Sequence, residues 1–294
     1  MIQGKILVTG ATGDTGRATV DELLARGNRV RALAHGQDER SKRLQDRGVE
    51  VVYGDLLDFG QVRAALSRVK RAYFVYPIRP GILQATAYFA QAAKSAGVEG
   101  IVNMSQISAR EDAKSHAATD HWLSERVFDW SGLTVAHIRP TYFAEWLLYL
   151  APMIKAGLLH VPFGTGKHAP IAAEDQGRVI AGILENPAAH KGKIYPLFGP
   201  VEYTYEETAR VLGRVLGKDV QYKQVDFEEF SQVLQASGKN AGRENSFLFQ
   251  HLREVVIDHQ NGIFAGTNDL VAKFGGRPPM TLEAFIEKHR AAFV

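Results

Sequence analysis

The chain has 294 residues and contains no cysteine. This absence excludes disulfides, thiolate nucleophiles and thiolate metal sites. No grouping of histidine, aspartate and glutamate has the spacing of zinc ligands, so we expect no metal. No apolar run is long enough to span a bilayer, and the first expected strand starts too near the N-terminus to leave room for a signal peptide. These absences predict a soluble, cytoplasmic protein without a membrane partner.

An excess of charge of one sign is also lacking. The 35 basic residues barely outnumber the 32 acidic ones, which gives a net charge of +3. Such an excess is too small for a nucleic-acid-binding surface, although it is compatible with an anionic cofactor. Hydrophobic residues make up 45% of the chain and charged residues 23%, which are ordinary values for a globular protein. We expect a monomer or a homodimer that acts on a small molecule.

Glycine is arranged in a regular pattern near the start of the chain. An apolar run at residues 5–9 precedes glycines at 10, 13 and 16, and a helix-like stretch follows at residues 17–24. Strand, glycine turn and helix in this order suit a dinucleotide pyrophosphate, whose phosphates rest on N–H groups at the helix N-terminus. A glycine-rich turn that binds nothing is the alternative. The predicted cofactor-binding residues of this turn are Gly10, Thr12, Gly13, Asp14, Thr15 and Gly16.

Strand-like and helix-like segments alternate through the first half of the chain. Strands are predicted at residues 6–9, 29–33, 49–53, 72–75, 100–104 and 134–138. Helices are predicted at residues 15–26, 39–45, 58–67, 82–96 and 116–130. Because alternating strands and helices pair in parallel through right-handed crossovers, we expect an α/β protein with a doubly wound, Rossmann-like sheet.

The second half has a different character. We expect a dinucleotide-binding domain at residues 1–141 and a smaller, mostly helical substrate lobe at residues 142–294 that is partly interleaved with it. Predicted helices there are 142–155, 173–185, 205–216, 227–236, 244–261 and 282–293, and predicted strands are 193–197 and 220–225. Thr281 is the expected N-cap of the last helix. The segment 157–168 is expected to be a glycine loop beside the substrate cleft.

The end of the second strand bears on the choice of cofactor. Folds that prefer NAD usually place an acidic residue about 20 residues after the glycines, to bind the ribose 2′-hydroxyl. Here the strand ends at His35 and the next acid is Asp38, followed by Arg40, Lys42 and Arg43. These cations can accept a 2′-phosphate, so we favour NADP(H) over NAD(H). The alternative is that they form a solvated helix face.

The third strand is followed by Gly54, Asp55 and Leu56. The carboxylate of Asp55 can accept a hydrogen bond from the adenine amino group, while Leu56 packs on the ring. An acid favoured by the dipole at a helix N-terminus is an equally good interpretation of Asp55.

Short motifs are spread over nearly the whole chain. They are Thr9-Gly10-Ala11-Thr12-Gly13-Asp14-Thr15-Gly16, Gly54-Asp55-Leu56, His121-Trp122-Leu123-Ser124-Glu125, Ser131-Gly132-Leu133, Ile138-Arg139-Pro140, Pro170-Ile171-Ala172, Glu174-Asp175 and Gly276-Arg277-Pro278-Pro279. Together they resemble the NmrA-like group of atypical short-chain dehydrogenases. The resemblance implies either an NAD(P)H-dependent reductase of quinones, azo dyes or triphenylmethane dyes, or a non-enzymatic redox sensor that binds NADP.

One departure from the wider dehydrogenase superfamily restricts the chemistry. The positions of its Tyr-x-x-x-Lys pair fall on Ala117 and His121, while its serine position falls near Ser105. Without that tyrosine there is no obvious acid for simple carbonyl reduction. Quinones, azo compounds and cationic dyes depend less on such an acid, because their reduced products are stabilised by delocalisation. We therefore predict an NADPH-dependent reductase of conjugated aromatic acceptors. The alternatives are an NADP sensor and a synthase-like or isomerising protein that uses the nucleotide passively.

The expected site residues follow the fourth and fifth strands. Tyr76 and Pro77 should flank the nicotinamide ribose, and Ser105 and Gln106 should face the substrate. His121 can bind the nicotinamide ribose or donate a proton, since histidine titrates near neutral pH. A partly buried structural histidine is the alternative for His121.

An aromatic stripe is predicted at the start of the second half. Tyr142, Trp146 and Tyr149 are spaced as on one face of a helix, with Phe143 beside them. The stripe can wall a flat aromatic pocket, or it can be plain core.

Overall fold

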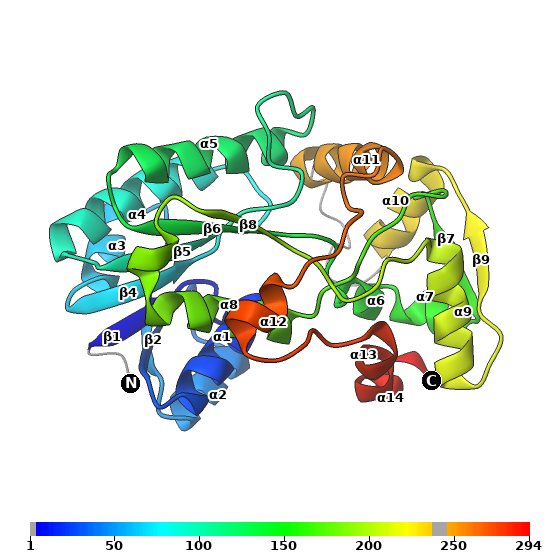
Figure 1. The fold of residues 1–294 in the computed structure, drawn as a ribbon, viewed down its shortest axis with the longest axis horizontal. Helices are drawn as coiled ribbons and strands as arrows, with labels where there is room; N and C mark the ends of the chain where they lie inside the picture. Colours follow the sequence, from blue (N-terminus) through cyan, green and yellow to red (C-terminus); the bar gives the residue numbers. More distant parts are fainter. Residues whose placement is uncertain (1–3, 237–245) are drawn as a thin grey trace.

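The computed structural model describes residues 4–236 and 246–294 of the chain. In these residues a parallel sheet of seven strands has the order β3-β2-β1-β4-β5-β6-β8 (Figure 1). The strands are β1 (Lys5–Val8), β2 (Arg29–Ala34), β3 (Glu50–Tyr53), β4 (Val69–Phe74), β5 (Gly100–Met104), β6 (Val135–Pro140) and β8 (Ile194–Leu197). The order reverses between β1 and β4, so the predicted doubly wound, Rossmann-like sheet is confirmed.

Helices cover both faces of the sheet because side chains alternate along each strand. Ile6 and Val8 of β1 point to one face and join a core with Val20 and Val179, whereas Leu7 points to the other face and packs near Phe89. The helices of the first face are α1 (Asp14–Ala25), α2 (Glu39–Asp46), α8 (Ala173–Glu185) and α12 (Leu270–Gly275). Those of the second face are α3 (Phe59–Ala65), α4 (Ile82–Ala96) and α5 (His116–Trp130).

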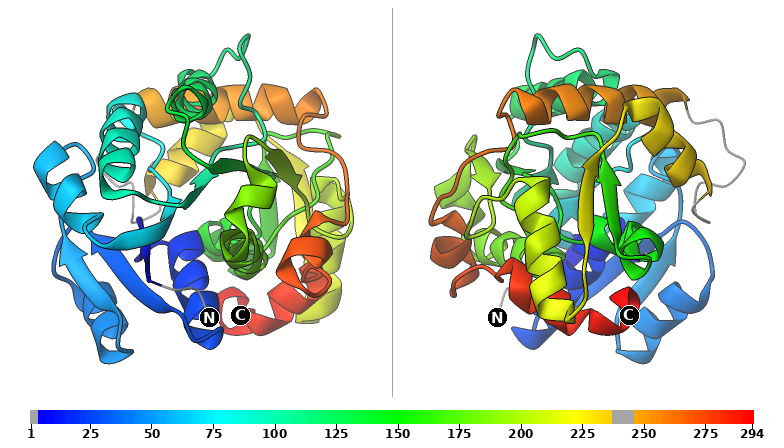
Figure 2. Two further views of the ribbon diagram at one scale, coloured as in Figure 1. Left: turned by 60° about the vertical axis from the view of Figure 1, so that its left-hand side comes forward. Right: turned by 90° about the vertical axis from the view of Figure 1, so that its right-hand side faces the viewer.

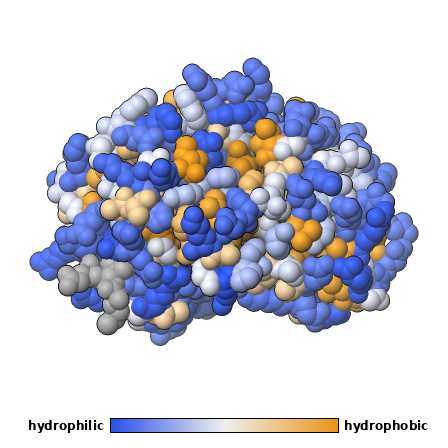
Figure 3. Space-filling model, viewed as in Figure 1, coloured by the Kyte–Doolittle hydropathy of each residue, from blue (hydrophilic) through white to orange (hydrophobic). Residues whose placement is uncertain are grey.

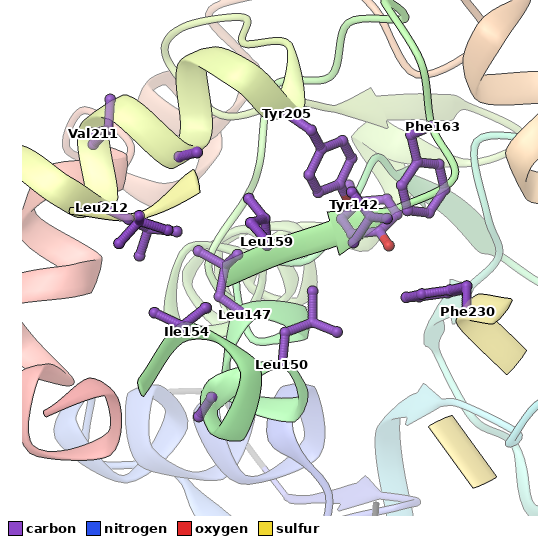
Figure 4. Close-up of a cluster of buried hydrophobic side chains, with 14 of the residues drawn as sticks. Tyr142, Leu147, Leu150, Ile154, Leu159, Phe163, Tyr205, Val211, Leu212 and Phe230 are labelled. Atoms are coloured by element: carbon purple, nitrogen blue, oxygen red, sulfur yellow. The ribbon is translucent and has the colours of Figure 1, made fainter. Parts of the chain in front are cut away.

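The second half of the chain adds to this sheet and also builds a core of its own. β8, α8 and α12 belong to the sheet layers, which is the interleaving that we propose for the 142–294 lobe. The remaining elements surround a separate cluster that includes Leu147, Leu159, Leu212 and Phe230 (Figure 4). These elements are β7 (Leu158–Val161), β9 (Gln221–Gln224), α6 (Trp146–Tyr149), α7 (Ala151–Lys155), α9 (Tyr205–Leu216), α10 (Phe227–Ala236), α11 (Ser246–Gln260), α13 (Leu282–Lys288) and α14 (Arg290–Phe293).

The predicted helix 142–155 is wrong. Its first residues pair as extended chain with Ile171, whose amide donates to the carbonyl of Tyr142 and whose carbonyl accepts from the amide of Ala144. The helical remainder is divided at Leu150 into α6 and α7. Pro152 lies in the first turn of α7 and has no N–H to continue the hydrogen bonding of α6, which explains the division.

Three smaller differences also lie in the second half. The predicted loop 157–168 contains β7, which pairs in parallel with β9. The predicted C-terminal helix is divided into α13 and α14, although Thr281 caps α13 as expected by accepting from the amide of Ala284. Helix α12 was not predicted. The first two residues of the predicted helix 244–261 lie outside the described residues.

The face shown in Figure 3 is largely hydrophilic, with hydrophobic side chains scattered over it. Within residues 4–236 and 246–294, no helix combines the length and the apolar character needed to cross a membrane.

Candidate functional site

Two cavities lie at the carboxyl ends of the central strands. We call the first the glycine groove; it has a volume of about 450 Å³ and follows the ends of β1 to β4. Its lining residues are Gly10, Thr12, Gly13, Thr15, Leu33, His35, Arg40, Gly54, Asp55, Leu56, Val75, Tyr76, Pro77 and Arg79. Open parallel sheets bind their ligands at this place, where the strand order reverses.

Glycines shape the groove at the N-terminus of α1. Gly10 has a φ of +55°, in the left-handed region that favours glycine. A Cβ at Gly16 would lie 2.1 Å from the Gly10 carbonyl oxygen, so only glycine lets α1 come this close to the turn. The Gly13 amide donates to that same carbonyl at 2.9 Å and closes the turn. The first amides of α1 remain for an anion, and the turn therefore fits a dinucleotide pyrophosphate.

The far end of the groove holds a histidine beside a carboxylate. His35 Nδ1 lies 3.9 Å from Asp55 Oδ2. Asp55 Oδ1 accepts from the Leu57 amide at 2.9 Å, which fixes the carboxylate in the turn after β3. The cap of α3 is Asp58, which accepts from the Gln61 amide at 3.0 Å. Asp55 is thus not the capping acid of α3, and its second oxygen is left for the groove.

Arg40 reaches the same end of the groove from α2, but it shares its charge. Its Nε and Nη2 donate to Asp38 Oδ2 at 2.8 and 2.6 Å. Asp38 is the N-cap of α2, and the Ser41 amide together with Arg40 holds the pKa of its carboxyl below the usual range. The Arg40 side chain is 65% exposed, so an anion can reach the guanidinium in competition with Asp38.

A second arginine in the groove was missed by sequence reasoning. Arg79 lies in the loop between β4 and α4, with its guanidinium 5.2 Å from the ring centroid of Tyr76. The Tyr76 hydroxyl donates to the Pro80 carbonyl at 3.1 Å and fixes the ring. No recognisable motif surrounds Arg79 in the sequence. Two guanidinium groups, those of Arg40 and Arg79, therefore line the groove.

The second cavity, which we call the histidine pocket, has a volume of about 240 Å³. It shares Thr15, Val75, Tyr76 and Pro77 with the glycine groove, so a ligand lying in the groove can extend into the pocket. Its other lining residues are Ile78, Met104, Ser105, Gln106, Ile107, His121, Pro140, Thr141, Tyr142, Phe143, Trp146, Leu248, His251, Leu252, Val255 and Phe264. Most of this wall is apolar, and its polar groups are few.

His121 contributes a neutral imidazole to the pocket. Its Nδ1 lies 2.7 Å from the Ala117 carbonyl and 3.0 Å from Gln106 Nε2. Because the carbonyl is nearer and can only accept, we assign the proton to Nδ1. Burial lowers the pKa of His121, against smaller opposing effects of Ala117 and Glu125. At neutral pH the ring therefore presents Nε2 as a hydrogen-bond acceptor. This state suits a contact with a ribose hydroxyl better than proton donation.

Ser105 and Gln106 lie where β5 ends, as expected, and both line the pocket. The Gln106 side-chain amide donates to the Ala117 carbonyl at 3.2 Å. Ser105 is buried, and among the described residues its Oγ has no hydrogen-bond partner. A buried hydroxyl without a partner is costly, and this one is enclosed by the side chains around it.

The aromatic residues at the start of the second half divide between pocket and surface. Tyr142, Phe143 and Trp146 line the pocket, whereas Tyr149 lines neither cavity and is 39% exposed. Tyr142 precedes α6, so the expected single helical stripe does not form. Burial raises the pKa of the Tyr142 hydroxyl, and the ring packs among other aromatic side chains, including Phe163 (Figure 4).

Helix α11 supplies a wall of the pocket that sequence reasoning missed. Leu248, Leu252 and Val255 recur at helical spacing and line the cavity together with His251. That spacing signals an amphipathic helix but not the surface on which it packs. His251 follows the last residue of β5 by more than 140 positions, so no local pattern joins it to the site.

Helix α5 is anchored from behind the pocket. Arg139 donates to the two carboxylate oxygens of the fully buried Glu125 at 2.8 and 2.6 Å. Ser124 and Thr86 join α5 to α4 through a hydroxyl pair at 2.8 Å. These contacts fix the helix that carries His121.

Three of the predicted cofactor residues line neither cavity. Asp14 begins α1, Gly16 acts through its close packing on Gly10, and Lys42 is exposed on α2. In the described part of the chain, no three His, Cys, Asp or Glu side chains gather into a group able to hold a metal ion.

The sequence matches the model of the NmrA-like family over residues 3–283. The chain belongs to this family. NAD(P)H azoreductase of Xenophilus azovorans is 31% identical over 291 residues, which cover 98% of this chain and 99% of the relative. Quinone oxidoreductase 2 of Escherichia coli strain K12 is 25% identical over 282 residues, which cover 94% of this chain and 96% of the relative. The solved structure of NmrA, a negative transcriptional regulator in complex with NADP, matches with a TM-score of 0.80 at 17% identity. The match covers 98% of this chain and 95% of that chain.

Some motifs of this NmrA-like chain serve the fold. The buried Arg178 of α8 pairs with Asp175 and donates to the carbonyls of Gly275 and Arg277, both at 3.0 Å. Asp175 also accepts from the amide of Met280 at 2.7 Å. The Glu174-Asp175 and Gly276-Arg277 motifs therefore meet in one clamp that holds the segment between α12 and α13.

Proposed function

We propose that this NmrA-like protein is an NADPH-dependent reductase of conjugated aromatic acceptors such as quinones, azo compounds or dyes. The observation that carries the proposal is the shared wall of Thr15, Val75, Tyr76 and Pro77, where the apolar histidine pocket opens on the glycine groove. When bound, the dinucleotide supplies a hydride from its reduced nicotinamide. The pocket gives a flat apolar acceptor a place beside that groove and excludes water from it.

The residues of the groove suit the parts of the dinucleotide in order along its length. The glycine turn and the first amides of α1 hold the pyrophosphate. Asp55 accepts from the adenine amino group, with Leu56 packed on the ring. Tyr76 and Pro77 flank the nicotinamide ribose, where His121 offers an acceptor for a ribose hydroxyl. The nicotinamide end then lies at the mouth of the histidine pocket.

The preference for NADPH over NADH rests on the far end of the groove. His35 and Arg40 line it, and both can bind the ribose 2′-phosphate. Asp38 competes for the same guanidinium, so the preference should be moderate rather than absolute. The relative from Xenophilus azovorans is named for either cofactor, which is compatible with this degree of preference.

The nature of the acceptor follows from what the pocket lacks. Ala117 stands where the wider superfamily carries its tyrosine, and His121, one turn further along α5, is neutral with its proton engaged. A ketone needs a proton donor at its oxygen, whereas a quinone or a cationic dye spreads the incoming electrons over its rings. The names of the azoreductase and quinone oxidoreductase relatives agree with this class of acceptor.

A redox sensor without turnover is the second candidate, because the NmrA regulator shares the fold. A sensor has no need of free space beside the nicotinamide, and side chains could fill it. Here about 240 Å³ lies open at that position, which favours the enzyme.

The test is the oxidation of NADPH by the purified protein with and without a panel of quinones, azo dyes and triarylmethane dyes. The reductase predicts oxidation that depends on the acceptor and is faster with NADPH than with NADH. Tight binding of NADPH without turnover of any acceptor would contradict the reductase and support the sensor.

A further inference from the structure

The histidine pocket contains a second imidazole, His251, that is held by the neighbouring helix. Helix α11 packs against the N-terminal end of α5 (Figures 1 and 2), and His251 Nδ1 lies 2.8 Å from Ser115 Oγ at the N-terminus of α5. Two further contacts join these segments: Gln250 donates to the Lys114 carbonyl at 2.8 Å and accepts from the His116 amide at 3.0 Å. These contacts fix α11 against the start of α5 and hold the His251 ring beside Ser115.

The hydrogen bonds of Ser115 determine where the His251 proton lies. Ser115 is the N-cap of α5, and its Oγ accepts from the Ala118 amide at 3.1 Å. Its hydroxyl proton needs an acceptor, and within residues 4–236 and 246–294 the one in reach is His251 Nδ1. Burial, with a smaller effect of His121, lowers the pKa of His251 to about 3, so the ring is neutral. A neutral ring that accepts at Nδ1 carries its proton on Nε2.

This Nε2–H group is available to a ligand. His251 lines the histidine pocket, and in the described part of the chain its Nε2 has no partner and is not among the atoms sealed from solvent. Three other polar side chains of the wall are engaged or enclosed. Gln106 donates to the Ala117 carbonyl, Thr141 donates to the Phe264 carbonyl at 3.0 Å, and Ser105 Oγ is sealed.

The two imidazoles of the pocket thus have opposite roles. His121 carries its proton on Nδ1 and presents an acceptor, whereas His251 carries its proton on Nε2 and presents a donor. An acceptor molecule with a carbonyl oxygen or an azo nitrogen needs the donor.

We propose that His251 is a catalytic residue whose Nε2–H donates a hydrogen bond to the quinone oxygen or azo nitrogen of the substrate. The inference rests on the proposed reductase function. In quinone reduction, two electrons and one proton arrive as hydride, a second proton comes from solvent, and a hydroquinone forms. The imidazole keeps its own proton throughout. Its N–H stabilises the negative charge that develops on the oxygen as the hydride arrives, from a position fixed in advance by Ser115.

The first part of the test observes the proton directly. Nitrogen NMR of protein labelled with ¹⁵N-histidine, with the His251→Gln variant to assign the signal, should show a neutral ring protonated at Nε2 across neutral pH. Addition of a quinone to the protein–NADP⁺ complex should shift this signal. A ring protonated at Nδ1, or a signal that a bound quinone does not move, would overturn the proposal.

The second part compares two substitutions. His251→Leu removes the donor and should lower kcat/KM for a quinone by about tenfold to 100-fold, the range of one hydrogen bond to a charged group. His251→Gln keeps an N–H near the position of Nε2 and should recover most of that loss, while the affinity for NADPH is unchanged in both.

The outcomes separate this proposal from the proposed function. If the wild-type protein reduces no acceptor, the reductase proposal fails, and the NMR shift still decides whether His251 binds a quinone. If the wild type is active and His251→Leu is equally active, the role of His251 alone is contradicted.

Discussion

The glycine groove and the histidine pocket adjoin, but they are built in different ways. All lining residues of the groove come from the first 79 residues, and its turn is formed by backbone at Gly10 and Gly13. The pocket is walled by side chains from Thr15 to Phe264, so both halves of the chain must pack before it exists. Local sequence specifies the first site and tertiary packing assembles the second. Substitutions should therefore affect the two sites separately.

The largest effect should come from Gly16→Val. Its side chain would collide with the Gly10 carbonyl and push α1 away from the turn. We expect the affinity for NADPH to fall by at least about 100-fold, as for other displacements of an organised site. Calorimetric titration with NADPH measures this. Ala25→Val, on the exposed last turn of α1, is the matched control and should bind normally; normal binding by Gly16→Val would refute the assignment of the turn.

Arg139→Met should weaken the anchoring of α5, the helix that carries His121 in the histidine pocket. It leaves the fully buried Glu125 carboxylate without its two hydrogen bonds from Arg139 and with Arg126 Nη2 at 3.6 Å as its remaining cation, which should lower the free energy of unfolding by about 3 kcal/mol. Urea unfolding measures the loss. The double variant Glu125→Leu/Arg139→Met removes both charges and should be more stable than the single one. If the free energy of unfolding falls no further in the single variant than in the double variant, the ion pair does not anchor α5.

Glu145→Gln should change how stability depends on pH. Glu145 is buried, its Oε1 accepts from the Ala173 amide at 2.9 Å, and burial raises its pKa to about 7. Because the folded protein binds this proton more tightly than the unfolded chain, wild-type stability should fall as pH rises from 4.5, the ordinary pKa, toward about 7.

The variant should lack that decline and be more stable than the wild type at pH above 7 by about 1–3 kcal/mol, the range of a buried charge relieved. Urea unfolding of both proteins at acidic and alkaline pH checks this. Parallel stability curves for the two proteins would contradict the raised pKa.

The smallest effect is expected within the groove, at the end that distinguishes the cofactors. Arg40→Ala should lower the affinity for NADPH by about tenfold, the value of one charge-assisted hydrogen bond, and leave NADH unaffected. Asp38→Asn keeps an N-cap for α2 while it frees Arg40, so it should raise the affinity for NADPH. Titration with both cofactors tests this, and equal losses for NADPH and NADH in Arg40→Ala would contradict a 2′-phosphate contact.

The contrast between the two sites also explains what the sequence could predict. In the first half, strand Gly100–Met104 and helices Ile82–Ala96 and His116–Trp130 have the predicted bounds, because their patterns are periodic and locally complete. The sheet order follows from that alternation.

The failures lie where distant segments decide the structure. Phe143 is not helical because it pairs with Ile171, and β7 forms because it pairs with β9 some 60 residues later. His251 reaches the pocket only through the packing of α11 on α5. Of the candidate site, the turn and the strand ends were predictable, while the wall from α11 required the tertiary structure.

The most direct test of the central claim, that groove and pocket form one continuous active site, is to follow the hydride itself. NADPH carrying deuterium in both C4 positions is incubated with the protein and a cationic triarylmethane dye. The mass of the colourless product is then measured by mass spectrometry. The account predicts a product with one deuterium on its central carbon, since the dye lies in the histidine pocket beside the groove. A reduced product without deuterium, or no reduction of any acceptor by a protein that binds NADPH, would contradict it.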